Sequence, residues 1–160
     1  MKLTIREIGF LEKAIALSRK GMLSGQGGPF GCVIVRGDEI IGEGSNAVTS
    51  TNDPTAHAEV VAIRQACKTL GTYQLTGCEI YTSCEPCPMC LGAIYWARPD
   101  RVIYANTKQE AAAIEFDDDF IYKEINTPMG ERKIPFIHYP HPDALKVFQD
   151  WHNWDGKKKY

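Results

Sequence analysis

The feature that most constrains the fold is a strand–helix–strand pattern in the middle of the chain. Glu79–Ser83 and Arg101–Ala105 are two short segments that we predict to be strands. Between them we predict a helix that begins near Pro86, which suits a first helical turn, and ends near Arg98. A helix of about a dozen residues between two strands is a crossover that pairs those strands in parallel. The pattern therefore indicates an α/β fold around a sheet with at least one parallel pair.

The preceding residues supply the first part of this fold. Apolar residues at helical spacing predict a helix over about 4–23. Two apolar segments, 30–35 and 40–46, flank a polar turn and predict a β-hairpin. The turn Asn52-Asp53-Pro54-Thr55 leads into a second helix, which Asp53 or Thr55 would cap and Gly71 would end.

The residues after the second strand of this pattern complete the predicted fold. We predict a helix over 108–125 that breaks near Asp117-Asp118-Asp119, a fifth strand over 134–139 and a last helix over 142–153. These elements predict a single domain over residues 1–160 with helices on both faces of a mixed sheet.

Composition excludes several classes of protein. The chain has 160 residues, of which 44% are hydrophobic and 24% charged, so it is long enough for one core and not disordered in bulk. No apolar run approaches the roughly 20 residues of a membrane span, and no signal peptide is evident, which predicts a cytoplasmic protein without a membrane partner. A net charge of −2 argues against nucleic acid as a partner, and Lys157-Lys158-Lys159 is typical of a solvated tail.

The six cysteines fall into two groups. Cys32, Cys67 and Cys78 lie in apolar patterns and are predicted to be core thiols, while Cys84, Cys87 and Cys90 cluster. A chain of this length without a secretory signal needs no disulfide framework. The cluster therefore predicts metal chemistry rather than cross-links.

His57-Ala58-Glu59 is the second concentration of reactive residues, and it combines with the cluster. One imidazole and two thiolates, from His57, Cys87 and Cys90, would hold a zinc ion and leave the open position of a catalytic site. Each motif stands at a predicted helix start, where the helix dipole favours a thiolate. Glu59 is then not needed as a ligand and is free to exchange protons with water.

Other interpretations of these cysteines stay open. A zinc ribbon needs a second cysteine pair, and the usual iron–sulfur run has a fourth nearby cysteine; the sequence has neither. A structural zinc held by three cysteines and one histidine, with Cys84 as the additional ligand, is harder to dismiss, although it leaves Glu59 without a role.

The two motifs carry a resemblance. H-x-E followed by P-C-x-x-C is the signature of zinc nucleobase deaminases, and His57-Ala58-Glu59 and Pro86-Cys87-Pro88-Met89-Cys90 match it. More narrowly, the chain resembles the bacterial guanine deaminases of the cytidine-deaminase-like superfamily, with the Phe116–Ile125 segment and Tyr160 pointing to guanine. Similar segments are Gly27–Gly31, Asn52–Glu59, Tyr81–Ala97, Phe116–Asp118, Phe120–Ile125 and Lys158–Tyr160.

This resemblance implies a fold and an activity. The fold is a three-layer α-β-α sandwich with a central mixed five-stranded sheet. The activity is zinc-dependent hydrolytic deamination of guanine to xanthine and ammonia, with one Zn²⁺ per chain. Glu59 would move the protons, and a second acid would come from the aspartate run, where we choose Asp118. Asp119 departs from the usual small polar residue at its position.

The resemblance also implies a substrate pocket and a dimer. The pocket residues would be Phe30, Asn46, Ala58, Trp96 and Tyr160. The C-terminal segment, about residues 140–160, would cross to the partner in a swapped homodimer, with Tyr160 as a lid. Two other functions remain: a guanosine, other nucleoside or tRNA deaminase with the same zinc chemistry, and a non-enzymatic module stabilised by zinc.

Overall fold

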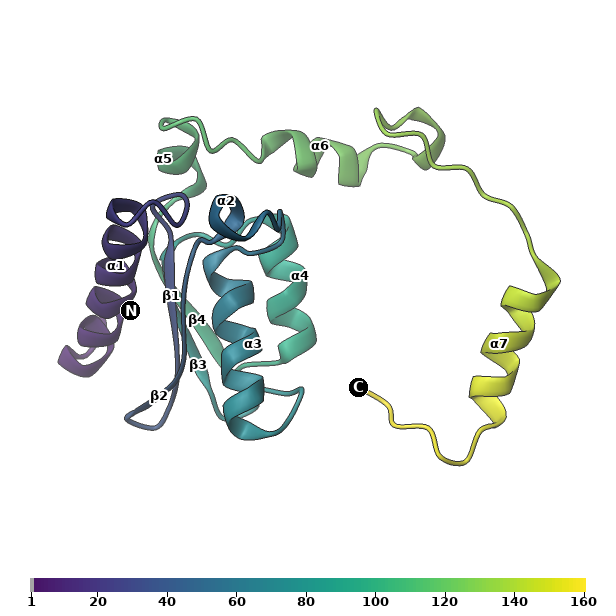
Figure 1. The fold of residues 1–160 in the computed structure, drawn as a ribbon, viewed down its shortest axis with the longest axis horizontal. Helices are drawn as coiled ribbons and strands as arrows, with labels where there is room; N and C mark the ends of the chain where they lie inside the picture. Colours follow the sequence, from purple (N-terminus) through teal and green to yellow (C-terminus); the bar gives the residue numbers. More distant parts are fainter. Residues whose placement is uncertain (1) are drawn as a thin grey trace. The chain divides into compact units, whose positions relative to one another are not determined.

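The computed structural model describes residues 2–160 and divides into two compact units. One unit ends at Asp118, and the other is Asp119–Tyr160. The first contains a mixed four-stranded sheet in the order β2-β1-β3-β4, in which β1 pairs antiparallel with β2 and β3, while β3 and β4 are parallel (Figure 1). The strands are β1 (Gly31–Arg36), β2 (Glu39–Ser45), β3 (Glu79–Cys84) and β4 (Arg101–Asn106).

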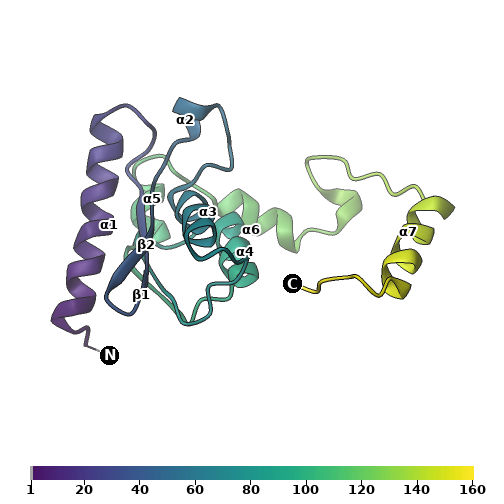
Figure 2. The same ribbon diagram turned by 60° about the horizontal axis from the view of Figure 1, so that its bottom comes forward.

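Helices cover both faces of this sheet. Figure 2 shows α1 on one face and α3 with α4 on the other, which confirms the three predicted layers within the first unit. The helices of this unit are α1 (Ile5–Leu23), α2 (Val48–Thr51), α3 (Ala58–Leu70), α4 (Pro88–Ala97) and α5 (Lys108–Ala112). The crossover from β3 through α4 to β4 confirms the parallel pair.

Strand β1 is the centre of the core. Its residues from Gly31 to Val35 are all buried, because the strand has a neighbour on each side and helices on each face. Cys32 and Ile34 pack toward α3, while Val33 and Val35 pack toward α1. Full burial of a Val or Ile side chain contributes about 1.5–3 kcal/mol, so β1 is a main source of stability.

Two glycines of β2 let α3 lie close against the sheet. A Cβ atom at Gly44 would lie 2.2 Å from the carbonyl oxygen of Ala58, and one at Gly42 would lie 2.5 Å from that of Ala62. These distances are far shorter than ordinary contacts, so larger side chains would push α3 away. The contact fixes the first turn of α3, which follows His57 and contains Glu59, over the sheet.

An ion-pair network ties α1 to the start of β3 and β4. Arg101 bonds to both Glu7 and Glu79, and Arg6 bonds to Glu79 with an N···O distance of 2.9 Å. The Tyr81 hydroxyl donates to Glu79 at 2.7 Å. Although burial opposes the shift, hydrogen bonds from Tyr81, Arg6 and Arg101 lower the pKa of Glu79 to about 2.

The predicted first helix is confirmed, together with the reason that it begins where it does. Thr4 is the N-cap of α1, and Glu7 completes a capping box by accepting from the Thr4 backbone N–H.

The predicted cap of α3 is wrong. His57 is the N-cap, while Asp53 accepts from the N–H and hydroxyl of Thr55 inside the preceding turn. The short α2 was not predicted.

The predicted five-stranded sheet is wrong, since the described residues form four strands. No strand forms over 134–139, where Ile134 is 72% and Ile137 90% exposed. Pro135 lacks an N–H to donate, and no other described strand lies within Asp119–Tyr160 to pair with this segment. An apolar segment without a paired neighbour cannot satisfy a strand's backbone groups.

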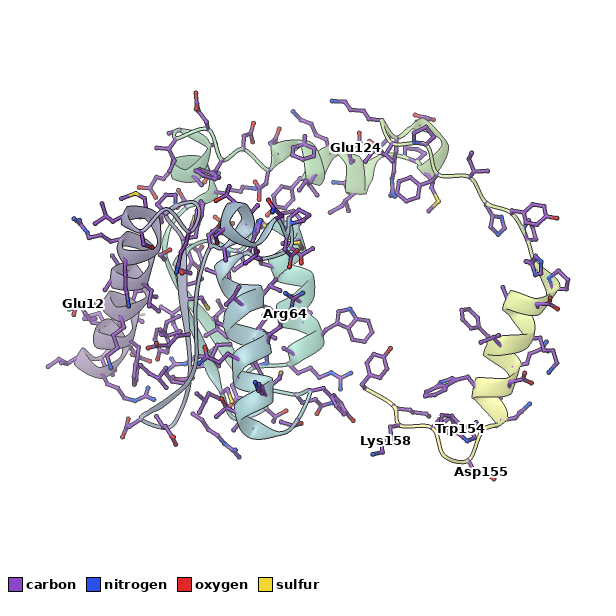
Figure 3. The ribbon with its side chains drawn as sticks, viewed as in Figure 1. Glu12, Arg64, Glu124, Trp154, Asp155 and Lys158 are labelled. Carbon is purple, nitrogen blue, oxygen red and sulfur yellow. The ribbon has the colours of Figure 1, made fainter. Side chains whose placement is uncertain are left out.

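The second unit is helical. It contains α6 (Asp119–Asn126), the 3₁₀ turn η1 (Met129–Glu131) and α7 (Pro142–Asn153), so the last helix is confirmed. The predicted helix over 108–125 does break, but the interruption runs from 113 to 118 and is longer than predicted. Trp154, labelled in Figure 3, follows α7, and its ring lies 5.4 Å from that of Trp151. Phe148, Trp151 and Trp154 are 76%, 43% and 55% exposed. Within residues 2–160, no helix combines the length and apolar character that crossing a membrane requires.

Candidate active site

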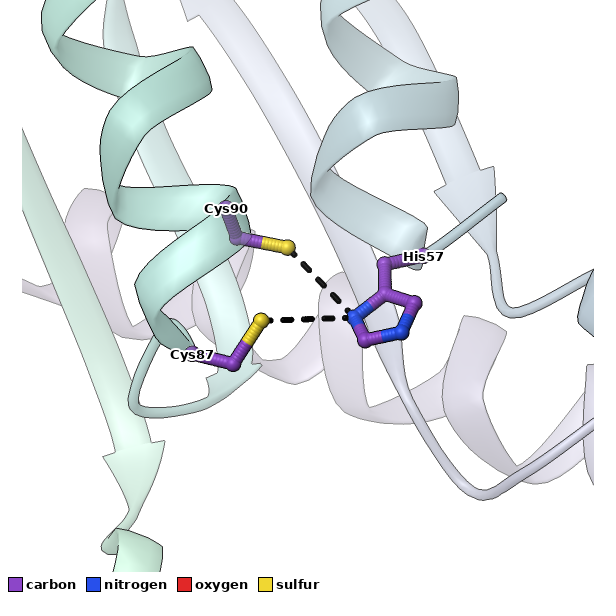
Figure 4. Close-up of side chains that lie close together, drawn as sticks. All are labelled: His57, Cys87 and Cys90. Atoms are coloured by element: carbon purple, nitrogen blue, oxygen red, sulfur yellow. Dashed lines mark hydrogen bonds between the residues drawn. The ribbon is translucent and has the colours of Figure 1, made fainter. Parts of the chain in front are cut away.

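Two helix starts bring the predicted metal ligands together. His57 is the N-cap of α3 and Cys87 the N-cap of α4, and neither side chain caps its own helix. Both point instead toward the space between the helices, as does Cys90 from the first turn of α4 (Figure 4). The Cys87 and Cys90 sulfurs lie 3.5 and 3.6 Å from the Nδ1 atom of His57.

These separations fit a zinc ion. Tetrahedral zinc, at about 2.3 Å from sulfur and about 2.0–2.1 Å from nitrogen, places each sulfur about 3.5–3.6 Å from the nitrogen. The three donor atoms all lie within 4.8 Å of one another. One nitrogen and two sulfurs form a donor set that zinc prefers, and three protein ligands leave one position open.

The ligand side chains are electrostatically coupled. A hydrogen bond from Cys90 lowers the pKa of Cys87 to about 4. Burial acts against this shift, and a hydrogen bond with His57 adds to it. The hydrogen bond to Cys87 and burial raise the pKa of Cys90, because Cys90 donates the proton that stabilises the Cys87 thiolate. A hydrogen bond to Cys87 also raises the pKa of His57. Since metal binding needs both thiolates and a neutral imidazole, it must release protons from this cluster.

Glu59 lies directly beside the ligands. Its side chain is 6% exposed, and its Oε2 atom lies 3.4 Å from the Cys90 sulfur. The Oε1 atom lies 3.3 Å from the hydroxyl of Thr82 on β3. Burial raises the pKa of Glu59, while hydrogen bonds from its own backbone N–H and from Cys90 act against that rise. A buried carboxyl group beside a metal site is suited to accept and return a proton.

Cys84 is not part of the ligand cluster. Its thiol lies 3.7 Å from the carbonyl oxygen of Thr107, and it is absent from the set of three donors. Burial raises the pKa of Cys84 to about 11. The geometry therefore favours the open three-ligand site over the closed site with three cysteines. Cys32 and Cys78 are buried, as predicted for core thiols, and Cys67 is half-buried.

Asp118 ends the first unit and acts on this cluster electrostatically. Burial, and then the nearby Cys87 charge, raise the pKa of Asp118, and its own charge contributes to the raised pKa of His57. The approach to Asp118 is bent at Glu115, whose φ of 71° is in the left-handed region. Phe116 then places its ring 4.9 Å from that of Phe30 in an edge-on arrangement.

The predicted pocket residues differ in how deeply they are buried and in what they contact. Ala58 is fully buried as the first residue of α3, and Asn46, 5% exposed, accepts from the N–H groups of Gly28 and Val48. Phe30 packs on the core beside Phe116. Trp96, on α4, is 64% exposed. Tyr160 lies in the second unit, so its contact with the pocket stays a prediction.

Three residues beside these groups lie in segments that carry the resemblance but were not among the predicted site residues. Thr82 contacts Glu59, Gly27 packs against Asn46, and Phe116 contacts Phe30. The alternation of β3 carries a signal for Thr82, because Ile80, Thr82 and Cys84 share the face toward α3 and α4. Gly27 and Phe116 lie in loops, where no periodicity marks a functional residue.

Comparisons with known proteins agree with this site. Residues 6–106 match the cytidine and deoxycytidylate deaminase zinc-binding region. The guanine deaminase of Bacillus subtilis strain 168 is 59% identical over 151 residues, which are 94% of this chain and 97% of that protein. An X-ray structure of guanine deaminase from Bacillus subtilis superposes with a TM-score of 0.93 at 58% identity, over 95% of this chain and 97% of the other.

A more distant relative shows how far the likeness extends. The tRNA-specific adenosine deaminase of Aquifex aeolicus strain VF5 is 31% identical over 142 residues, 89% of this chain and 91% of that protein. The family match covers more than half of the chain and includes His57, Glu59, Cys87 and Cys90. The chain therefore belongs to the cytidine and deoxycytidylate deaminase family of zinc-binding proteins and, within it, groups with the guanine deaminases.

Proposed function

We propose that this protein hydrolyses guanine to xanthine and ammonia with the help of one zinc ion per chain. The observation that carries the proposal is the three-ligand cluster beside buried Glu59, in a chain that resembles a guanine deaminase over 94% of its length. His57, Cys87 and Cys90 would hold the zinc. When bound, zinc would supply a Lewis acid and lower the pKa of water at its open position.

Glu59 performs the proton transfers. As the oxygen of a water molecule bonds to C2 of guanine, the carboxylate accepts one water proton and delivers it to the neighbouring ring nitrogen. A second proton, from the added hydroxyl group, passes to the exocyclic amine. The C2–N bond then breaks, ammonia departs and xanthine remains, so one water is consumed for each guanine. The buried position of Glu59 suits a group that must exist in both protonation states.

The remaining pocket residues bind and orient the base. Phe30 stacks on the purine ring, and the Asn46 amide binds its polar edge, since its Oδ1 atom already has two backbone donors and its NH₂ group offers two more hydrogens. The backbone of Ala58 and the ring of Trp96 line the pocket. Asp118 is the second acid, which assists Glu59 in passing the proton of the added hydroxyl group to the leaving amine.

The C-terminal segment completes the site of a partner subunit. We assign residues 140–160 to a swapped homodimer in which Tyr160 covers the partner's pocket and excludes water. The support is the exposure of three large apolar side chains, Phe148, Trp151 and Trp154, which a helix in contact only with water has no reason to carry. Mixing tests this swap. Glu59→Gln chains refolded with chains lacking Tyr160 should regain activity, because one mixed site has both groups, and the absence of any recovery contradicts the swap.

The protein works in the cytoplasm. All six of its cysteines are free, and two of them must stay reduced to bind zinc. A reducing compartment provides that condition.

A substrate panel tests the proposed activity. Purified enzyme with one equivalent of zinc is incubated with guanine, guanosine, adenine, cytosine or cytidine, and ammonia and the deaminated base are measured. We expect guanine to be the preferred substrate. Preference for guanosine would support the nucleoside alternative. Activity on a tRNA anticodon stem would support the function of the Aquifex aeolicus relative, which the net charge of −2 does not favour.

A further inference from the structure

Thr82 holds an unusual position for a hydroxyl group. It is 1% exposed on β3, where its backbone pairs with Cys32 of β1 on one side and Tyr104 of β4 on the other. Its hydroxyl oxygen lies 3.3 Å from Oε1 of Glu59 and 3.4 Å from the carbonyl oxygen of Gly31. A β-branched side chain on an internal strand has little rotational freedom, so this hydroxyl is a rigid reference point.

The two oxygens of Glu59 therefore have different surroundings. Oε1 faces the sheet and Thr82, while Oε2 lies 3.4 Å from the Cys90 sulfur, on the side of the ligand cluster. Rotation of the carboxyl group by half a turn would exchange them. A hydrogen bond to one oxygen opposes that rotation, and bonds to charged acceptors are the stronger ones.

We infer that Thr82 is a positioning residue for the deamination: it fixes Oε1 of Glu59 and thereby commits Oε2 to proton transfer. This inference rests on the proposed function of the site. The hydroxyl has one hydrogen and two lone pairs. It can donate to Oε1 of the Glu59 carboxylate, and it can still donate there when Oε2 carries the proton, because Oε1 remains an acceptor. Thr82 thus keeps Oε1 in place in both states of the catalytic cycle.

The test compares three variants at one position. Thr82→Val keeps the shape and removes the hydroxyl, Thr82→Ser keeps the hydroxyl, and Thr82→Ala is a smaller substitution if valine prevents folding. We expect Thr82→Val to lower kcat about 10- to 100-fold while KM changes less than about threefold, because orientation affects the reaction rather than binding. Thr82→Ser should recover kcat to within about threefold of wild type.

Ser83→Ala is the matched control. Ser83 is also buried on β3, but its hydroxyl accepts from the Gly31 N–H and makes no contact with Glu59. It should lower the melting temperature and leave kcat within about twofold, since losing a buried hydrogen bond costs about 1–3 kcal/mol of stability. Zinc content should be equal in all four variants.

Crystal structures of the zinc-loaded wild type and Thr82→Val supply a readout that does not depend on turnover. We expect the Glu59 carboxyl group to be rotated or to occupy two conformers in the valine variant. An unchanged carboxyl group, or a kcat within about twofold of wild type in Thr82→Val and Thr82→Ala, would overturn the inference. Wild-type enzyme that is inactive on guanine would instead refute the proposed function, and the carboxyl orientation would still decide the role of Thr82.

Discussion

Replacement of Gly27 by alanine should disable the pocket without touching the metal site. A Cβ atom at Gly27 would lie 2.2 Å from Oδ1 of Asn46, 2.6 Å from its carbonyl oxygen and 2.9 Å from its carbonyl carbon. Ordinary contacts are about 3.4–4 Å, so Asn46 must move by roughly 1 Å. Two of the three atoms are backbone, so a rotamer change of the amide cannot relieve the contact.

The size of the effect follows from what Asn46 would lose. Its Oδ1 atom accepts from Gly28 and Val48 at 3.3 and 3.2 Å, and these bonds orient the amide that we propose binds the base. A displacement of about 1 Å costs about 100-fold in rate, and overpacking costs about 1–3 kcal/mol of stability. We therefore expect Gly27→Ala to lower kcat/KM for guanine about 100-fold and to lower the melting temperature by several degrees.

Xanthine formation, calorimetry and zinc analysis together check this prediction. Zinc content should not change, because the three atoms nearest to the added Cβ all belong to Asn46 and none to a predicted ligand. Gly9→Ala is the control: a Cβ atom there meets nothing within 4 Å, and alanine within α1 should raise stability by about 0.5–1 kcal/mol with kcat/KM unchanged. A Gly27→Ala enzyme with wild-type kcat/KM would refute the role given to Asn46.

Three further predictions concern proton transfer and acid stability. Glu59→Gln keeps the shape of the side chain but cannot accept a proton, so turnover should fall at least about 100-fold with zinc retained; near-normal turnover would remove Glu59 from the mechanism. Asp118→Asn should reduce kcat more than Asp119→Asn, whose carboxylate pairs with Lys123 on exposed α6, and the reverse order would move the second acid by one residue. Because the folded-state pKa of Glu79 is lowered to about 2, its contribution to stability is present above about pH 4.5 and is lost as the pH falls toward 2. Urea unfolding at pH 7, 5 and 3 should show this loss, and Arg101→Met should flatten it while Lys146→Met, which breaks an exposed pair, should not.

The parts of the fold that the sequence predicts are those with a local signal. Apolar residues at helical spacing predict α1, and two strand segments on either side of a helix that begins near Pro86 predict the crossover. The strand predicted over 134–139 is wrong because the apolar character of a segment is only a local signal. Strand formation also depends on a neighbouring strand, which no local pattern reports.

The candidate site likewise has some features with a local sequence signal and others that depend on residues distant in sequence. The spacing of His57, Cys87 and Cys90 predicts the ligands, since donor types and helix starts are visible along the chain. The contact between Thr82 and Glu59 joins residues 23 apart in sequence, across a sheet and a helix. That pairing depends on the register between β1 and β3 and on the close approach of α3 that Gly44 allows, neither of which a single sequence specifies.

Zinc content and xanthine formation in two cysteine variants test the central claim most directly. Cys87 is one of the three clustered donors, whereas Cys84, three residues earlier on β3, lies against the Thr107 carbonyl. Cys87→Ala should lose zinc and guanine deamination together, while Cys84→Ala should retain most of its zinc and convert guanine to xanthine and ammonia in equal amounts. Loss of zinc from Cys84→Ala as complete as that from Cys87→Ala would make the metal site a closed structural one and would contradict the account.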